Sequence, residues 1–306
     1  MQSTLDTPCS PVDGRPVPAA PRAAHPTVSV RRLTAAIGAE IDGLDLARDV
    51  LAGQPVRSRQ TVDLLRETIA RHHMVVLRGQ FLSARQHEQV AHLFGPIAAS
   101  PVQLAVGGDR RPGVSTIEDT PERPPAGFPW HTDVSWSPDA PRLGFLAAVT
   151  IPDYGGDTIW ASTAAIYDRL APAERALCDS LQVIHAPDAA LLESVARHHG
   201  QDAAARLAAR YPGTAQPLVT RHPVTSRRSL FLSPLYARRI VGPAGDDGRL
   251  LDRLHAELDD PEVQVRWRWR DGDFVIWDET ATCHRALTDH HPQRRVMRRC
   301  TTTRRR

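Results

Sequence analysis

The chain reads FVIWDETATCHRA over residues 274–286. The first four residues, Phe274–Trp277, form a short apolar run that is typical of a buried strand, and His284 follows shortly after it. Similar short segments rich in Val, Thr, Trp and Phe lie at 143–150, 158–161, 216–224, 229–233, 263–269 and 295–303. Turn sequences such as Asp271-Gly272 separate them, so much of the chain is predicted to consist of short strands.

Helical patterns flank and interrupt these strands. Apolar residues share one helical face over 61–71, and Ser83 and Gln86 have the spacing of a capping box that begins a second helix. Further helices are expected at 164–180, 189–209 and 247–258. Many short strands with a few helices predict an α+β fold that is mostly β: a cupin-like jelly roll, or double-stranded β-helix, with flanking helices. No GxGxxG motif joins a strand to a helix, which argues against a Rossmann fold.

The composition predicts one globular domain behind a short leader. Of the 306 residues, 41% are hydrophobic and 24% are charged, so wholesale disorder is excluded. Residues 1–26 combine several prolines with small and polar residues, and we expect them to form a flexible Pro/Ala-rich leader because they offer little apolar surface to bury. The domain is expected to cover 27–306.

The composition also limits the compartment and the partners. No run of 18 apolar residues occurs, and no apolar segment follows Met1, so neither a membrane-spanning helix nor a secretory signal is expected. Four cysteines without metal-site spacing fit reduced thiols in a cytoplasm. The basic excess lies mainly in 294–306, which we expect to be a solvated tail, so nucleic acid is not the expected partner. The sequence leaves a homo-oligomer open.

The segment Trp130-His131-Thr132-Asp133 is the first candidate for chemistry. In an extended segment, side chains two residues apart point to the same side, so His131 and Asp133 can meet at one ion. A jelly roll can bring His284 beside this pair. Two imidazoles and one carboxylate form the facial triad of non-haem Fe(II) oxygenases, although the same set can hold catalytic zinc. Most other histidines are expected on the surface or in loops, among them His72, His73, His290 and His291.

Two arginines follow His284 in the next predicted strand. In a strand, Arg295, Met297 and Arg299 share one face. A guanidinium beside the metal could hold a dicarboxylate through two parallel hydrogen bonds. The alternative that the residues alone leave open is a surface strand in an arginine-rich tail.

Together these motifs resemble the taurine dioxygenase family of Fe(II)/2-oxoglutarate-dependent oxygenases. The resemblance covers roughly 28–303 and rests on the order and spacing of His131-Thr132-Asp133-Val134, Gly155-Gly156-Asp157-Thr158, Trp277-Asp278, His284 and 293–299. It implies that His131, Asp133 and His284 hold Fe(II), with 2-oxoglutarate and O2 as cosubstrates. It further implies that the far carboxylate of 2-oxoglutarate binds Arg295 and the Thr158 hydroxyl.

The substrate-binding positions depart from those of taurine-specific members. Where these use a His, a Tyr, an Asn and a distal Arg, the corresponding residues here are Ser100, Gln103, Gly127 and Arg299. Only Arg299 matches, so a taurine amine and sulfonate would lose partners at a cost of about 1–3 kcal/mol each. Tyr236 falls where the family has an aromatic wall of the pocket. The resemblance therefore implies a small, anionic substrate other than taurine, with its anionic group on Arg299.

The predicted function is a dioxygenase that couples decarboxylation of 2-oxoglutarate to succinate and CO2 with oxidation of a substrate C–H bond. The sequence leaves the outcome of this oxidation open: hydroxylation, desaturation, ring closure, or collapse of a hydroxylated carbon beside a sulfate ester. The enzyme is expected to act in specialised metabolism or in the use of alkyl sulfates or sulfonates. The carboxylate at Asp133 disfavours halogenation, which needs a small residue there. One alternative is a modifier of nucleic acid or protein, supported only by the basic tail. Another is a non-catalytic binding module. If Arg299 pairs with a protein carboxylate instead, a neutral substrate is expected.

Overall fold

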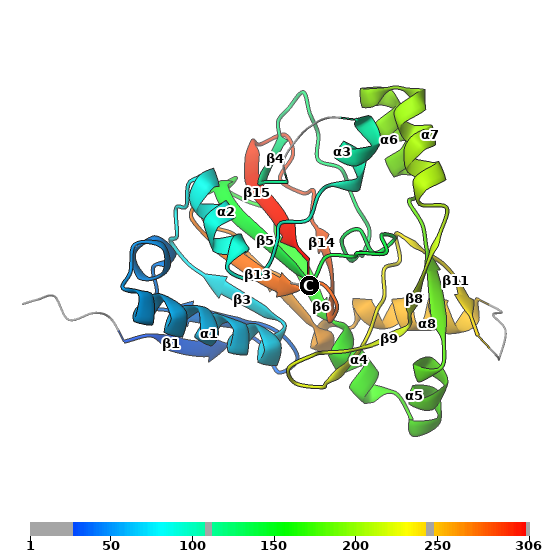
Figure 1. Cartoon of the computed structure of the whole chain (residues 1–306), viewed down its shortest axis with the longest axis horizontal. Helices are drawn as coiled ribbons and strands as arrows, with labels where there is room; N and C mark the ends of the chain where they lie inside the picture. The colour runs from blue at the N-terminus through cyan, green and yellow to red at the C-terminus, as the bar shows by residue number, and fades with distance from the viewer. Residues whose placement is uncertain (1–26, 108–111, 243–247, 304–306) are drawn as a thin grey trace, which may run out of the picture.

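Two sheets of different size face each other in the computed structural model, which describes residues 27–107, 112–242 and 248–303 (Figure 1). The predicted leader, 1–26, lies outside the described residues. The large sheet has the strand order β1-β2-β3-β13-β5-β15-β4, and its strands are β1 (Ser29–Arg32), β2 (Ala39–Asp42), β3 (Met74–Leu77), β4 (Ser115–Asp119), β5 (Leu143–Thr150), β13 (Phe274–Asp278) and β15 (Arg295–Thr302). The small sheet consists of β12 (Gln264–Trp267), β6 (Thr158–Ser162) and β14 (Thr282–Ala286), with β6 in the middle.

The inner faces of the two sheets pack together through aromatic residues and methionines. Trp160 and Trp267 of the small sheet share one buried cluster with Met74, Trp277 and Met297, which belong to the large sheet. Trp160 meets Trp277 edge-on, with 5.7 Å between the ring centroids. Two mostly antiparallel sheets packed face to face confirm the predicted jelly roll.

Strand β13 shows how the sequence produces this packing. Val275 and Trp277 point into the cluster between the sheets, whereas Phe274 and Ile276 pack on the opposite face of the large sheet, as the two-residue period of a strand requires. Gly144 of β5 lies opposite Trp277, and a side chain at this position would collide with the indole ring. The absence of a side chain at Gly144 therefore lets the tryptophan lie flat against its neighbour strand.

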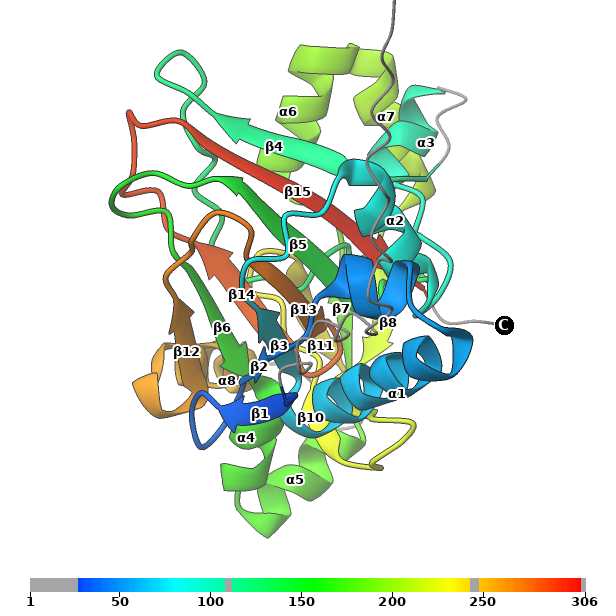
Figure 2. The same ribbon diagram turned by 90° about the vertical axis from the view of Figure 1, so that its left-hand side faces the viewer.

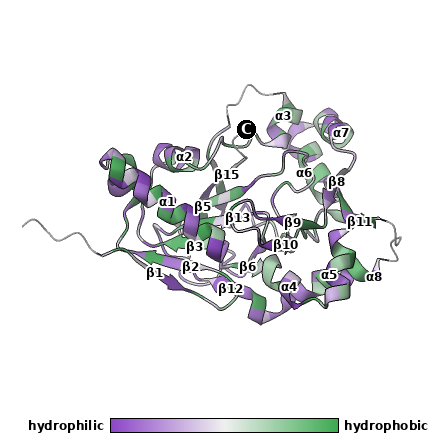
Figure 3. Ribbon diagram, turned by 60° about the horizontal axis from the view of Figure 1, so that its bottom comes forward, coloured by the Kyte–Doolittle hydropathy of each residue, from purple (hydrophilic) through white to green (hydrophobic). Residues whose placement is uncertain are grey.

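Helices cover the outer face of the large sheet (Figure 2). They are α1 (Pro55–His72), α2 (Ala84–His92) and the π-helical turn η1 (Ala47–Leu51). Leu65 and Ile69 of α1 are buried in the outer cluster, and Figure 3 shows hydrophobic and hydrophilic bands alternating along this helix. The predicted capping box is present, because Ser83 Oγ accepts from the Gln86 N–H at 3.3 Å and Gln86 Oε1 accepts from the Ser83 N–H at 2.9 Å.

The remaining elements lie on the outer side of the small sheet and at one end of the molecule. They are α3 (Pro101–Val106), α4 (Thr163–Arg169), α5 (Pro172–Asp179), β7 (Gln182–His185), α6 (Ala189–His199), α7 (Gln201–Arg210), β8 (Thr214–Pro217), β9 (Val219–Arg221), β10 (Arg228–Leu230), β11 (Ala237–Val241), α8 (Arg249–Ala256), η2 (Glu257–Asp259) and η3 (Pro261–Val263). Two predicted helices are each divided: Pro172 begins α5, and Gly200, with a φ of 89°, separates α6 from α7.

Two expectations about polar residues need correction. His73 and His290, expected on the surface or in loops, do lie in a bend and a turn between elements, but each is buried, with 1% of its surface exposed. His73 lies at the end of α1 against Arg227, and His290 Nε2 lies 3.3 Å from Asp119 Oδ2. The segment expected to be a solvated tail is largely strand β15, which is paired on both sides by β5 and β4; residues 304–306 lie outside the described part. Among the described residues, no helix is long and apolar enough to cross a bilayer.

Candidate active site

The backbones of His131 and His284 join two distant segments of the chain. The His131 N–H donates to the His284 carbonyl at 3.0 Å, and the His284 N–H donates to the His131 carbonyl at 2.8 Å. This bridge fastens the segment after Trp130 to strand β14. As a result the two imidazole rings lie 4.3 Å apart between their centroids, which places the predicted histidine pair together.

Asp133 reaches the same place through a turn. The segment was expected to be extended, but it turns at Asp133, and Val134 has a φ of 50°, a left-handed conformation that is strained for a β-branched residue. Asp133 Oδ1 lies 3.6 Å from His131 Nε2 and 3.8 Å from His284 Nε2. One potential ligand atom from each of the three residues lies within 4.8 Å of the other two, so they form a compact donor group.

Burial keeps both imidazoles in the form that binds metals. Desolvation lowers the pKa of His131 to about 4 and holds the pKa of His284 well below its usual range. His131 Nδ1 lies 2.9 Å from the Pro129 carbonyl, a contact that requires the proton on Nδ1 and leaves the lone pair on Nε2. The His284 ring packs edge-on against Trp277 and stacks with Trp160 at 6.3 Å. Both rings are therefore neutral and fixed in direction.

Two buried residues that sequence reasoning missed hold the Asp133 segment. The Thr132 N–H donates to Ser233 Oγ at 3.1 Å, and Thr132 Oγ1 lies 2.9 Å from the Leu232 carbonyl. The Asp133 N–H donates to Glu279 Oε2 at 3.1 Å. Desolvation raises the pKa of the Glu279 carboxyl well above its usual range. The sequence signal that could have indicated a role for Glu279 was its position directly after Trp277-Asp278. Only the folded structure shows that its side chain is buried beside Asp133.

A cavity of about 240 Å³ opens beside the histidine rings on the inner face of the large sheet. Arg295, Met297 and Arg299 all line it, which confirms that these residues share one face of β15. Arg295 is 5% exposed and donates from Nε to the Gly156 carbonyl at 3.1 Å. A Cβ atom at Gly156 would lie 3.0 Å from Arg295 Cδ, so the glycine turn leaves room for this arginine.

Thr158 lines the same cavity from strand β6. Its Oγ1 accepts a hydrogen bond from Trp269 Nε1 at 3.0 Å. Because a hydroxyl has one hydrogen and two acceptor sites, this bond leaves the Thr158 hydroxyl hydrogen free to donate to a ligand. The buried Arg295 guanidinium and the Thr158 hydroxyl therefore line the same cavity.

Arg299 lies where two cavities meet. Its Nη2 contacts Asp133 Oδ2, and its side chain lines both the first cavity and a second cavity of about 180 Å³. Burial lowers the pKa of Arg299 to about 10. The buried Arg299 Nε has no hydrogen-bond partner among the described residues, so the protein leaves part of the guanidinium unsatisfied.

A model of the family described as "Taurine catabolism dioxygenase TauD, TfdA family" matches residues 29–301. The chain belongs to this family. It is 31% identical over 280 residues to an alkylsulfatase of Acinetobacter baylyi, and the alignment covers 90% of this chain and 84% of the relative. It is 32% identical over 279 residues to an alpha-ketoglutarate-dependent sulfate ester dioxygenase of Pseudomonas putida, and this alignment covers 90% of this chain and 89% of the relative. The crystal structure of a taurine dioxygenase from Burkholderia xenovorans has a TM-score of 0.70 at 31% identity, with 91% of each chain covered.

As a member of the TauD/TfdA family, the protein is a dioxygenase that depends on Fe(II), O2 and 2-oxoglutarate, for which alpha-ketoglutarate is another name. The enzyme and the cofactors that the sequence predicted are thereby confirmed. The side chains present fit these cofactors: two neutral imidazoles and a buried carboxylate form one donor group beside a cavity that ends at a buried arginine.

The structure separates the predicted substrate residues of this TauD/TfdA dioxygenase. Ser100, the N-cap of α3, and Gln103 line the second cavity together with Arg299. Gly127 lies between two residues that line the first cavity, Ala126 and Phe128. Among the described residues, neither of these cavities includes Tyr236 in its lining. Tyr236 instead packs near Trp136, with 6.2 Å between the ring centroids, and burial raises its pKa to about 12.

Proposed function

We propose that His131, Asp133 and His284 hold the Fe(II) of this dioxygenase through two imidazole nitrogens and one carboxylate oxygen. The observation that carries the proposal is that the two oxygens of the Asp133 carboxylate have different neighbours. Oδ1 faces the two Nε2 atoms, and Oδ2 faces Arg299. Coordination through one oxygen leaves positions for 2-oxoglutarate and O2. Together with 2-oxoglutarate, bound Fe(II) supplies the oxidation of a C–H bond by O2, and succinate and CO2 are released.

The far carboxylate of 2-oxoglutarate is proposed to bind Arg295 and Thr158. Arg295 is buried at the wall of the first cavity, and its nearest carboxylate oxygen, Asp119 Oδ2, lies 4.0 Å from Nη1. A guanidinium that is poorly neutralised by the protein gains from a bidentate carboxylate partner. The free hydroxyl hydrogen of Thr158 adds a second donor from the facing sheet.

For the primary substrate we propose an alkyl sulfate or a related sulfate ester. Two extensively matching relatives carry names that specify this class. Arg299 offers a guanidinium for the anionic group, and Ser100 and Gln103 make the adjoining cavity polar. Apolar residues such as Phe128 and Leu146 line the first cavity and suit an alkyl body. Gly127 has no side chain that could bind a taurine amine.

The proposed outcome is cleavage of the ester. Oxidation inserts one oxygen atom into a C–H bond of the carbon that carries the sulfate oxygen. The hydroxylated carbon then expels sulfate as its C–O bond breaks, and an aldehyde remains after the hydroxyl proton leaves. Arg299 would hold the sulfate during this step and stabilise its charge as it departs.

An anaerobic optical titration tests both proposals. Wild-type protein with Fe(II) and 2-oxoglutarate should develop a metal-to-ligand charge-transfer band, and His131→Ala should lack it. A medium-chain alkyl sulfate should shift the band, whereas taurine and the corresponding alcohol should not. Absence of the band in wild type would contradict the metal site. A band that responds to the alcohol but to no sulfate ester would contradict the substrate class.

Two wider predictions accompany this function. We propose that 27–306 form one dioxygenase domain, because large-sheet and small-sheet residues from both ends of the chain share one cluster. A cytoplasmic location stays a prediction, which fractionation would test. The sequence leaves the oligomeric state open, and analytical ultracentrifugation would determine it.

A further inference from the structure

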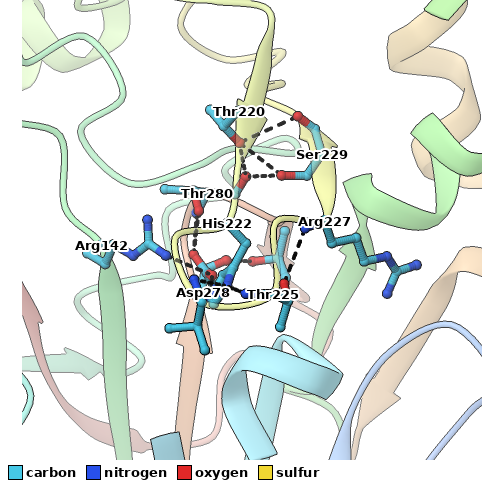
Figure 4. Close-up of polar contacts among 10 residues, drawn as sticks. Arg142, Thr220, His222, Thr225, Arg227, Ser229, Asp278 and Thr280 are labelled. Atoms are coloured by element: carbon cyan, nitrogen blue, oxygen red, sulfur yellow. Dashed lines mark hydrogen bonds and ion pairs between the residues drawn. The ribbon is translucent and has the colours of Figure 1, made fainter. Parts of the chain in front are cut away.

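The turn between β13 and β14 is held from one side by Asp278 (Figure 4). Asp278 is fully buried, and its Oδ1 accepts from both the N–H and the hydroxyl of Thr280, at 2.9 Å and 2.7 Å. Its Oδ2 lies 3.4 Å from His222 Nε2 and 3.8 Å from Arg142 Nη2. These contacts fix the start of the turn, so the direction of the next residue, Glu279, is set by the surrounding fold.

Glu279 extends from this turn to the metal-binding segment. Its side chain is fully buried, and its own N–H donates to the Arg142 carbonyl at 3.0 Å. Its Oε2 accepts the N–H of Asp133, a residue that lies 146 positions earlier in the chain. The left-handed conformation of Val134 turns the chain at this point, so the Asp133 N–H lies outside the strand pairing that satisfies His131.

Asp133 also has a competing partner. Arg299 contacts the carboxylate oxygen that faces away from the histidine rings. A backbone that was free to rotate at Asp133 would allow the carboxylate to turn further toward this guanidinium, and fewer of its conformers would then direct an oxygen at the ring nitrogens. The hydrogen bond from the Asp133 N–H restricts that rotation.

We propose that Glu279 is a positioning residue for Asp133: its carboxyl oxygen holds the Asp133 backbone so that Oδ1 points at the metal. The inference rests on the proposed role of Asp133 as a ligand. It requires an acceptor of the right length at position 279 and does not require a negative charge there. Glutamine, which has a carbonyl oxygen at the same distance from the backbone, should therefore replace glutamate.

The experiment compares Mn(II) binding by metal-free Glu279→Gln and Glu279→Met, measured by calorimetry with the metal alone. Glu279→Gln should bind Mn(II) within about threefold of wild type. Glu279→Met fills a similar volume but has only a weakly accepting sulfur and should bind about 10–100-fold more weakly, the range typical for lost outer-shell contacts. The matched control is Tyr167→Phe, which removes the hydrogen bond from the buried Tyr167 of α4 to Asp179 at the end of α5 and should lower the melting temperature without changing Mn(II) affinity.

The possible results separate the inference from the proposed function. Failure of wild type to bind Mn(II) would overturn the metal site itself. Wild-type affinity in Glu279→Met, or an equal loss in Glu279→Gln and Glu279→Met, would overturn only the positioning role. If Glu279→Met does not fold, Glu279→Asn replaces it, because the shorter amide is polar but cannot reach the Asp133 N–H. Full Mn(II) affinity in Glu279→Asn would likewise overturn the inference.

Discussion

Arg299 contacts Asp133 through the carboxylate oxygen that faces away from the histidine rings. This contact connects the proposed substrate site with the proposed metal site, since the Arg299 side chain adjoins both. A substitution at Arg299 is therefore expected to change two properties at once, and only measurements that treat metal and substrate separately can distinguish them.

Arg299→Ala is predicted to weaken binding of an alkyl sulfate at least tenfold. Removing one partner of a desolvated charged pair costs about 2–5 kcal/mol, and Arg299→Lys should recover part of the loss because it restores a charge without the planar fork. Dissociation constants for the sulfate, measured by the optical shift at saturating Fe(II) and 2-oxoglutarate, provide the test. Equal sulfate affinity in Arg299→Ala and wild type would leave Arg299 as a partner of Asp133 alone and favour a neutral substrate.

Arg295→Ala is predicted to weaken 2-oxoglutarate binding more than Thr158→Val does. The arginine change breaks a buried charged pair, worth about 2–5 kcal/mol, whereas the threonine change removes one neutral hydrogen bond worth about 1 kcal/mol. Thr158→Val should also lower stability, because Trp269 Nε1 loses its acceptor. Titrations of 2-oxoglutarate, together with thermal unfolding, separate the two effects. Unchanged 2-oxoglutarate affinity in Arg295→Ala would refute the assigned cosubstrate site.

Gly144→Ala is predicted to destabilise the fold without direct contact with the donor group. The added methyl group would collide with the ring of Trp277 at the centre of the large sheet. Overpacking of this kind costs about 1–3 kcal/mol. Urea unfolding measures the change, and Gly127→Ala, where the added atom meets only Thr288 Cγ2 at 3.8 Å, serves as a comparison for the packing contribution. The prediction fails if the two alanine variants are equally stable.

Acid is predicted to destabilise the fold through buried histidines such as His87. Burial, followed by the nearby charge of Arg298, lowers the pKa of His87 to about 3. The unfolded chain therefore binds a proton below about pH 6.5 that the folded chain binds only near pH 3, so stability is full above pH 6.5 and falls as the pH decreases through this window.

His87→Leu should reduce the slope of unfolding free energy against pH by about one proton between pH 6 and 4. The matched change at the exposed end of α6, His199→Leu, should leave the slope as it is. Chemical unfolding at several pH values measures both slopes, and an unchanged slope in His87→Leu would disprove the assignment.

The sequence was sufficient where a local period or a spaced motif carries the information. The apolar run 274–277 predicted a buried strand, and the two-residue period of a strand predicted that Arg295 and Arg299 share one face, which lines one cavity. Pro172 and Gly200 could also have predicted the two helix breaks, since both residues are common at helix ends. Such signals act over a few residues and need no knowledge of the fold.

The surroundings of several residues that sequence reasoning did not predict depend on distant packing. His73 is buried because β13 and Arg227 approach the end of α1. Glu279 accepts a hydrogen bond from the N–H of Asp133, a residue that lies far earlier in the chain. Tyr236 packs beside Trp136, away from the two cavities, because helices α3, α6 and α7 form a cluster of their own there. None of these long-range contacts produces a periodic pattern in the sequence from which it could be predicted.

The position of β15 in the large sheet has a consequence for synthesis of the protein. This strand lies between β5 and β4, although both are made long before it. Until β15 leaves the ribosome, β5 and β4 have open edges that can pair with other chains. Pairing over such sequence distances is also slow, because long loops must close first. Nascent chains should therefore depend on chaperones, and truncation before Arg295 should produce aggregates rather than a smaller folded protein.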